Sequence, residues 1–123
     1  MSTDEGLVIY SIRDATIVTF NDASVLDTLK IQQIGEKLYH LVEQRHCKKL
    51  VLDFDKVEFL SSSALGMLIT LRQKAEAIKG RVAICALQGN IKKAFKITRL
   101  DKLFDFYDDE QAALASFGIS TAG

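Results

Sequence analysis

The sequence predicts an α/β domain with a mixed, mostly parallel sheet of about four to five strands, about four helices and an N-terminal β-hairpin at the sheet edge. Residues 50–54 and 82–87 are nearly unbroken apolar runs, which are typical of strands covered on both faces of a parallel sheet. Apolar residues recur at helical spacing between these runs, so the three segments form a β-α-β unit with short connections. Residues 7–20 have the composition of a hairpin.

The hairpin is predicted from two short segments, residues 7–12 and 15–20, that are rich in Val, Ile, Thr and aromatic residues. This composition favours strands over helices. Arg13 and Asp14 lie between the two segments and are interpreted as the turn.

An amphipathic helix is expected after the hairpin. Ser24 and Asp27 have the spacing of a capped helix start, and we expect the helix to end near Arg45. The apolar face that predicts this helix consists of Ile31, Ile34, Leu38, Leu41 and Val42.

The helix between the two buried strands is predicted from a second set of apolar residues at helical spacing. Gly80 stands where a glycine is expected to end this helix. The residues that form the apolar set are Ala64, Leu68, Leu71, Ala75 and Ile78.

The C-terminal third of the chain is expected to contain two shorter helices and one strand. Asn90 is expected to cap the first helix, and residues 104–107 are expected to form the strand. The last helix is predicted over residues 108–117, because Asp108 and Gln111 have the spacing of a capping box.

The composition describes one globular domain with balanced charge. Lys and Arg total 16, Asp and Glu also total 16, and 48% of the 123 residues are hydrophobic. A chain of this size can bury a core without disulfides or metals, so we expect a single domain over residues 1–123. The balanced charge counts against a nucleic-acid partner, because a basic surface is what neutralises phosphates.

Cysteine and histidine usage argues against a redox or metal site. Cys47 and Cys85 are too far apart for a CxxC pair, and His40 and His46 cannot supply a zinc site by their spacing. We therefore expect buried free thiols, no metal and no cofactor. The chain shows no signal peptide and no apolar run near the roughly 20 residues of a membrane span, which predicts a cytoplasmic protein.

Residues 57–68 join the first buried strand to the following helix and carry three consecutive serines, Ser61, Ser62 and Ser63. At a helix N-terminus the backbone N–H groups are unpaired and the macrodipole is positive, so a hydroxyl can cap the helix and a phosphate can be accommodated. The first turns of this helix are apolar nearly all round. Part of that surface is therefore expected to meet a partner protein.

Residues 59–66, Phe-Leu-Ser-Ser-Ser-Ala-Leu-Gly, resemble the Phe-Met-Asp-Ser-Ser-Gly-Leu-Gly motif of STAS domains, a family of bacterial anti-sigma factor antagonists. Residues 50–59 resemble the strand that leads to this motif, and residues 97–104 and 107–114 resemble the family's C-terminal signature. The likeness covers about residues 7–117 and implies a STAS domain with short termini.

The resemblance implies a switched binding module. In the family, an unphosphorylated antagonist binds an anti-sigma factor that is itself a serine kinase of the GHKL type, related to histidine-kinase ATPases, and phosphorylation of one serine ends the interaction. The phosphoacceptor falls on Ser62, with Ser63 and Ser61 as alternatives. A serine phosphatase is a further implied partner, and a homodimer is left open. The implied contact residues are Asp22, Ser61, Ser62, Ser63, Ala64, Leu65 and Met67.

Two departures from the family pattern bear on regulation. Ser61 replaces the family's acidic residue, while Ala64 and Gly66 keep the small residues that follow. The loop around Asp22 is longer than the family's usual turn and lacks its glycine. An unswitched scaffold or accessory subunit of a signalling or transport complex, with Ser62 acting only as a cap, is therefore a second class of function. A small hydrolase is the least favoured class, because the chain lacks a GxSxG elbow and a histidine near the serines.

Two charged features have plain interpretations. Asp53 and Asp55 stand at the end of a central strand, where turn and capping roles are favoured over an acid–base or metal pair. The basic stretch over residues 92–102 is interpreted as a solvated helix face, with docking to a partner as the alternative.

Overall fold

A computed structural model describes residues 2–4, 7–20 and 28–119 of the chain. In this part the strands form one six-stranded sheet whose spatial order follows the chain from β1 to β6. The first two pairings are antiparallel and the remaining three are parallel. The strands are β1 (Ser2–Asp4), β2 (Leu7–Ile12), β3 (Ala15–Phe20), β4 (Lys49–Asp53), β5 (Arg81–Cys85) and β6 (Asp105–Tyr107).

The predicted α/β class, with a mixed sheet and an N-terminal hairpin, is confirmed. β2 and β3 form the hairpin that the sequence predicts, in a register that pairs Leu7 with Phe20 and Ile12 with Ala15. The structure adds one strand to the expected set, because β1 pairs with the outer side of β2.

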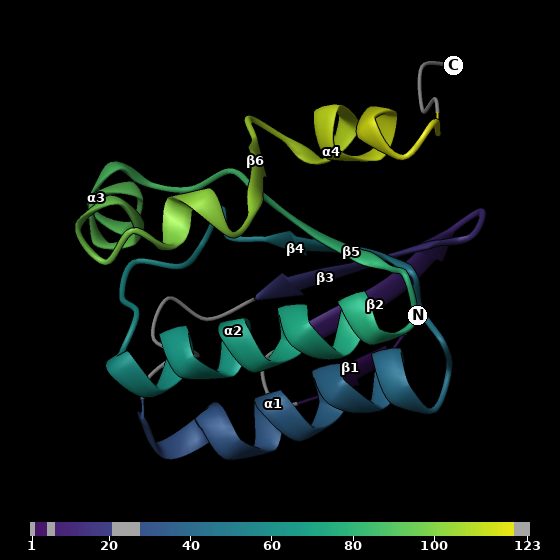
Figure 1. Ribbon diagram of the computed structural model, residues 1–123, viewed down its shortest axis with the longest axis horizontal. Coiled ribbons are helices and arrows are strands. Elements are labelled where there is room, and N and C mark those ends of the chain that lie inside the picture. The colour runs from purple at the N-terminus through teal and green to yellow at the C-terminus, as the bar shows by residue number, and fades with distance from the viewer. Residues whose placement is uncertain (1, 5–6, 21–27, 120–123) are drawn as a thin grey trace.

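The helices divide between the two faces of the sheet. α1 (Thr28–Glu43) and α2 (Ser62–Ala77) lie side by side under one face, whereas α4 (Glu110–Ser116) lies across the other (Figure 1). α3 (Gly89–Ile97) and the short 3-10 helix η1 (Leu100–Lys102) connect β5 to β6. Strands β4 and β5 are therefore covered on both faces, as their apolar runs indicated.

The side chains of β4 alternate between two cores. Leu50 and Leu52 belong to the larger core under α1 and α2, while Val51 belongs to the smaller core under α4. Within the larger core, Phe20 and Phe54 pack edge to face with ring centroids 5.2 Å apart. A strand buried on both faces needs apolar residues at successive positions, and this explains the unbroken run in the sequence.

α1 buries the five apolar residues predicted for it, all at most 8% exposed. Its end differs slightly from the expectation: the helix stops at Glu43, and Arg45 lies in the following turn, where its N–H donates to the His40 carbonyl at 3.2 Å. The proposed start at Ser24 and Asp27 lies outside the described residues.

Gly80 does not end α2 in the way the sequence suggested. The helix ends at Ala77, and the left-handed residue after it is Lys79, with φ of 62°. Gly80 is needed for space instead, because a Cβ at this position would lie 2.8 Å from the Lys48 Cα and 2.9 Å from its carbonyl oxygen. The prediction of a C-cap glycine is therefore wrong, and close approach of two chain segments is the reason for this residue.

The predicted caps of the two last helices are each displaced by one or two residues. α3 is preceded by Gln88 as its N-cap, whereas Asn90 lies inside the helix. α4 is capped by Asp109, whose carboxylate accepts from the Ala112 N–H at 2.8 Å, so the predicted capping box at Asp108 is wrong. Asp109 has the extended backbone that an N-cap requires.

Candidate functional site

The serine loop, residues 54–61, leads from the end of β4 to the start of α2. Its first half is anchored in the molecule: the Phe54 N–H donates to the Cys85 carbonyl at 3.0 Å, and the Val57 N–H donates to the Phe54 carbonyl at 2.9 Å. The side chains of Phe54 and Val57 are fully buried. The first half of the loop is therefore held in place against the rest of the protein, and this positions the serines at the start of α2.

Ser61 is the N-cap of α2. Its backbone is extended, its Oγ accepts from the Ala64 N–H at 3.0 Å, and its side chain is largely buried. Serine and aspartate are both strong N-cap residues because each offers an oxygen to the unpaired N–H groups of the first turn. The serine at this position can therefore cap α2 as the acidic residue of the STAS motif would.

Ser62 and Ser63 are the first two residues of α2, and both are exposed. The first turn of this helix contains no acidic residue. Free N–H groups and the positive end of the helix dipole favour negative charge at this place. A phosphate on either hydroxyl would meet no carboxylate within that turn.

Two of the predicted contact residues point into the protein. Ala64 is fully buried and Met67 is 5% exposed, whereas Leu65 is only partly buried. Met67 lies against α1, where a Cβ added to Gly35 would stand 3.0 Å from the Met67 Cγ. The nearly continuous apolar surface of α2 is thus explained by two neighbours, the sheet and α1.

Two backbone carbonyls of the serine loop are bonded to side chains of α3 and its cap. The Asn90 side-chain amide donates to the Glu58 carbonyl at 2.8 Å, and the Gln88 amide donates to the Asp55 carbonyl at 3.0 Å. Between these ties and Ser61, Phe59 is 54% exposed, which is unusual for a large aromatic residue. The sequence motif included Phe59, but its role as a contact residue was not predicted, although a large aromatic residue beside the serines is itself a signal of a binding surface.

Asp22, the acidic residue proposed for the same surface, lies outside the described residues. Strand β3 ends at Phe20 and α1 begins at Thr28. The contribution of Asp22 stays a prediction.

Asp53 has the turn role predicted for it, because its carboxylate accepts from the Asp55 N–H at 2.9 Å. It also has a partner that sequence reasoning missed, the side chain of Glu110 at the start of α4. Burial, together with this hydrogen bond, raises the pKa of Asp53 to about 7. In the described part of the chain, no group of three or more His, Cys, Asp or Glu residues is arranged to hold a metal ion.

The cysteines are buried and the basic residues of the stretch over residues 92–102 are exposed to solvent, as predicted from the sequence. Cys47 and Cys85 are buried free thiols, and burial is the main cause that raises the pKa of Cys85. The lysines of α3 point to solvent while Ile91 and Phe95 are buried. Within residues 2–4, 7–20 and 28–119, every helix is too short or too polar to cross a membrane.

Comparison with known proteins places most of the chain, serine loop included, in one family. The sequence pattern of the STAS domain matches residues 7–113. The chain belongs to the STAS domain family. The match includes the sheet from β2 to β6, the serine loop and most of α4.

Related STAS proteins are similar over most of their length. An anti-sigma factor antagonist of Bordetella bronchiseptica, BtrV, is 22% identical over 76% of this chain and 79% of its own. The crystal structure of an anti-sigma factor antagonist from Thermotoga maritima superposes with a TM-score of 0.85 at 17% identity, covering 92% of this chain and 95% of that one. The phosphorylated form of the Bacillus protein SpoIIAA superposes with a TM-score of 0.70 at 19% identity, covering 90% and 98%. These structures share the fold of this STAS domain.

Proposed function

We propose that this STAS domain is an anti-sigma factor antagonist, a regulatory binding module that uses a surface we call the serine face. The face comprises Phe59, Ser62, Ser63, Leu65 and Gly66. The observation that supports the proposal is that three consecutive serines have different roles. Ser61 caps the helix, whereas the hydroxyls of Ser62 and Ser63 are exposed. The family of the chain and the names of its relatives support the same function.

The proposed partner is an anti-sigma factor that is also a serine kinase, and the proposed phosphoacceptor is Ser62. A phosphate would add about −1.5 to −2 charge to the serine face without refolding α2. The bare domain presents a neutral, partly apolar surface, whereas the phosphorylated domain would have to desolvate that charge on binding. In this proposal the chemistry belongs to the partner kinase, and a serine phosphatase would restore binding.

Ser63 is the alternative acceptor, because it is exposed on the same turn. Ser61 ranks last, since its Oγ accepts the capping bond and its side chain is largely buried. Phosphorylation of Ser61 would compete with the cap, whereas phosphorylation of Ser62 would leave it in place.

The test begins with recovery of the partner from the native lysate and mapping of phosphorylated residues on the recovered domain. Binding of that partner is then measured by calorimetry for Ser62→Ala and Ser62→Asp. We expect Ser62→Ala to bind within about twofold of the parent and Ser62→Asp to bind at least about tenfold more weakly, because a desolvated charge costs more than 1.4 kcal/mol.

Ser11→Asp is the matched control, because Ser11 is exposed on β2 and its replacement adds the same charge away from the serine face. It should bind like the parent. Equal binding by all three variants, with no phosphate transferred to Ser61, Ser62 or Ser63, would contradict the switch and leave the unswitched scaffold as the function.

A further inference from the structure

A pocket of about 240 Å³ lies between α3 and β6, the last strand of the sheet. Its apolar lining comes from Leu87, which follows β5, from Phe95 of α3 and from Phe106 of β6. The rings of Phe95 and Phe106 pack edge to face with their centroids 5.2 Å apart. An apolar cavity of about 150 Å³ is enough to bind benzene. This space, which we call the α3 pocket, therefore has room for an aromatic ring or a short alkyl chain.

Two exposed lysines of α3, Lys92 and Lys96, also line the α3 pocket. They are four residues apart in the helix, so their side chains are neighbours on one side of it. In the described part of the chain, no carboxylate lies within ion-pair distance of either ammonium group. Like charges at this spacing destabilise a helix, and an anion bound between them would relieve the repulsion.

One carboxylate limits the charge that the α3 pocket can accept. Asp101 of η1 lines the pocket and is half-buried. Two ammonium groups and one carboxylate leave a single net positive charge. A ligand with one negative charge balances this set, whereas a phosphate ester, with a charge of about −1.5 to −2, would carry an excess that Asp101 repels.

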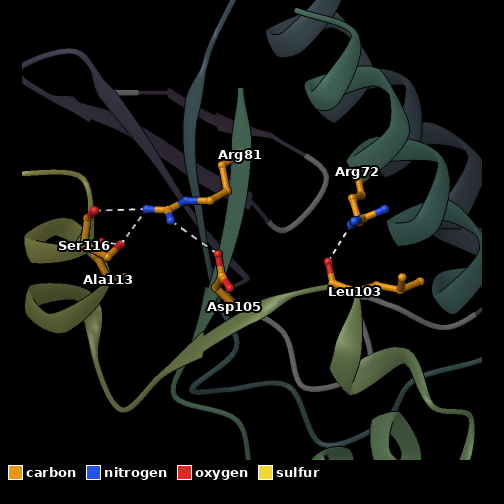
Figure 2. Close-up of polar contacts among 6 residues, drawn as sticks. All are labelled: Arg72, Arg81, Leu103, Asp105, Ala113 and Ser116. Atoms are coloured by element: carbon orange, nitrogen blue, oxygen red, sulfur yellow. Dashed lines mark hydrogen bonds and ion pairs between the residues drawn. The ribbon is translucent and has the colours of Figure 1, made fainter. Parts of the chain in front are cut away.

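A second basic cavity offers its charge to the chain itself. Its volume is about 300 Å³, and Arg72 and Arg81 line it. The Arg72 guanidinium donates to the Leu103 carbonyl, and the Arg81 guanidinium donates to the carbonyl and the hydroxyl of Ser116 at 3.0 and 3.2 Å (Figure 2). Arg81 also pairs with Asp105 at 3.5 Å. These guanidinium groups are already bonded within the protein, so the α3 pocket is the stronger candidate for a ligand.

We propose that the α3 pocket binds a small organic anion that carries one negative charge and an apolar body, namely an aromatic or short-chain carboxylate. The apolar body lies against Phe95 and Phe106, and the carboxylate accepts hydrogen bonds from Lys92 and Lys96. No residue of the serine face lines this pocket. The inference therefore does not depend on the proposed partner or on phosphorylation.

An NMR titration of the nitrogen-15-labelled full chain with 2-naphthoate tests the site. We expect saturable shifts centred on the amides of Leu87, Phe95 and Phe106, with a Kd of about 1 mM or lower, as is usual for a ligand of this size. Neutral 2-naphthamide keeps the rings and loses the charge, so it should bind at least about fivefold more weakly. Acetate keeps the charge and loses the rings, so it should cause no saturable shift at these residues.

A pair of double variants separates the pocket lysines from the general charge of the helix. Lys92→Gln combined with Lys96→Gln should weaken 2-naphthoate binding at least about fivefold and leave 2-naphthamide binding unchanged. Lys93→Gln combined with Lys102→Gln is the matched control, because it removes the same charge from exposed lysines that do not line the pocket. The control should bind 2-naphthoate within about twofold of the parent, since charges distant from the ligand are screened.

The proposal is overturned by any of three results. The absence of saturable shifts with 2-naphthoate up to about 10 mM excludes a ligand of this class. Equal affinities for 2-naphthoate and 2-naphthamide, or full 2-naphthoate binding by the Lys92 and Lys96 double variant, exclude recognition of the charge by these lysines. Binding of 2-naphthyl phosphate more than about tenfold tighter than 2-naphthoate assigns the pocket to more highly charged ligands.

Discussion

Ser61 determines where α2 begins, because its Oγ pairs with one of the N–H groups that a helix start leaves unsatisfied. Ser61→Ala should therefore lower the free energy of unfolding by about 1 kcal/mol, the usual cost of losing an N-cap. Ser61→Asp should unfold like the parent, because a carboxylate caps equally well. Urea unfolding followed by circular dichroism measures all three proteins.

Ser63→Ala serves as the control for this prediction, since Ser63 is exposed inside the first turn and does not cap. It should stay within about 0.5 kcal/mol of the parent. A Ser61→Asp variant as unstable as Ser61→Ala would show that the cap is not what this serine contributes.

At the residue scale, the sequence predicted the serines but not their roles. Ser61, Ser62 and Ser63 all have side chains that can cap a helix, and only the backbone conformation decides which one does. Asp53 shows the same limit more clearly. Its neighbour Asp55 was visible in the sequence, but Glu110 comes into contact only through the packing of α4 on the sheet.

Gly66, inside α2, and Gly80, between α2 and β5, should respond in opposite ways to replacement by alanine. Gly66 lies in the helix with no atom within 4 Å of an added Cβ, so Gly66→Ala should stabilise the domain by about 0.5–1 kcal/mol. Gly80→Ala should destabilise it by about 1–3 kcal/mol, because the new Cβ would overlap the Lys48 backbone. Thermal and urea unfolding of both variants measures the difference.

A destabilising effect of Gly66→Ala would contradict this account of α2.

The Gly66→Ala variant also tests the proposed function. A helix that keeps a glycine on its exposed side leaves room for another protein to approach, so we expect Gly66→Ala to weaken partner binding while it stabilises the free domain.

At the element scale, the sequence located the four α-helices of the described residues but misplaced several ends and missed the short helix η1. The apolar periodicity that predicts α1 and α2 extends over several turns and is therefore a strong signal. A cap depends on one residue, and Asp108 and Asp109 are chemically equivalent candidates for α4. Strand β1 was missed because it has three residues, Ser2–Asp4, none of them apolar.

For the whole molecule, the raised pKa of Asp53 predicts that stability falls as pH rises. The folded domain holds the Asp53 proton up to about pH 7, whereas the unfolded chain releases it near 3.8. The folded state therefore binds more protons between these values, and the contribution of Asp53 is complete below about pH 4 and lost by about pH 7. Urea unfolding at several pH values across this window should show the decline.

Asp53→Asn isolates this contribution, because it should remove the decline while leaving titrating groups away from the end of β4 unchanged. The Lys49 ammonium beside Asp14 lowers the pKa of that aspartate and so acts in the opposite direction, but only at more acidic pH. A parent and variant with parallel pH profiles would contradict the assignment to Asp53.

The fold class was predictable from the sequence because several independent signals agreed. Apolar runs at 50–54 and 82–87, the helical periodicity between them and the hairpin composition all favour one α/β arrangement. The division of the sheet into two cores could not be read from these runs, since a fully apolar strand gives no sign of which face each residue takes.

The order of the strands in the sheet has a consequence for how the domain assembles. Each strand from β1 to β6 pairs with its immediate neighbour along the chain, so no strand must wait for a later one to be inserted between two others. Each parallel pair is consequently joined by a single crossover connection, but its partners, such as Ala15 and Lys49, remain far apart in sequence, which slows folding relative to a helical bundle. We expect the sheet to grow from a single edge as the chain leaves the ribosome, with α4 docking last, once β4, β5 and β6 have formed its platform.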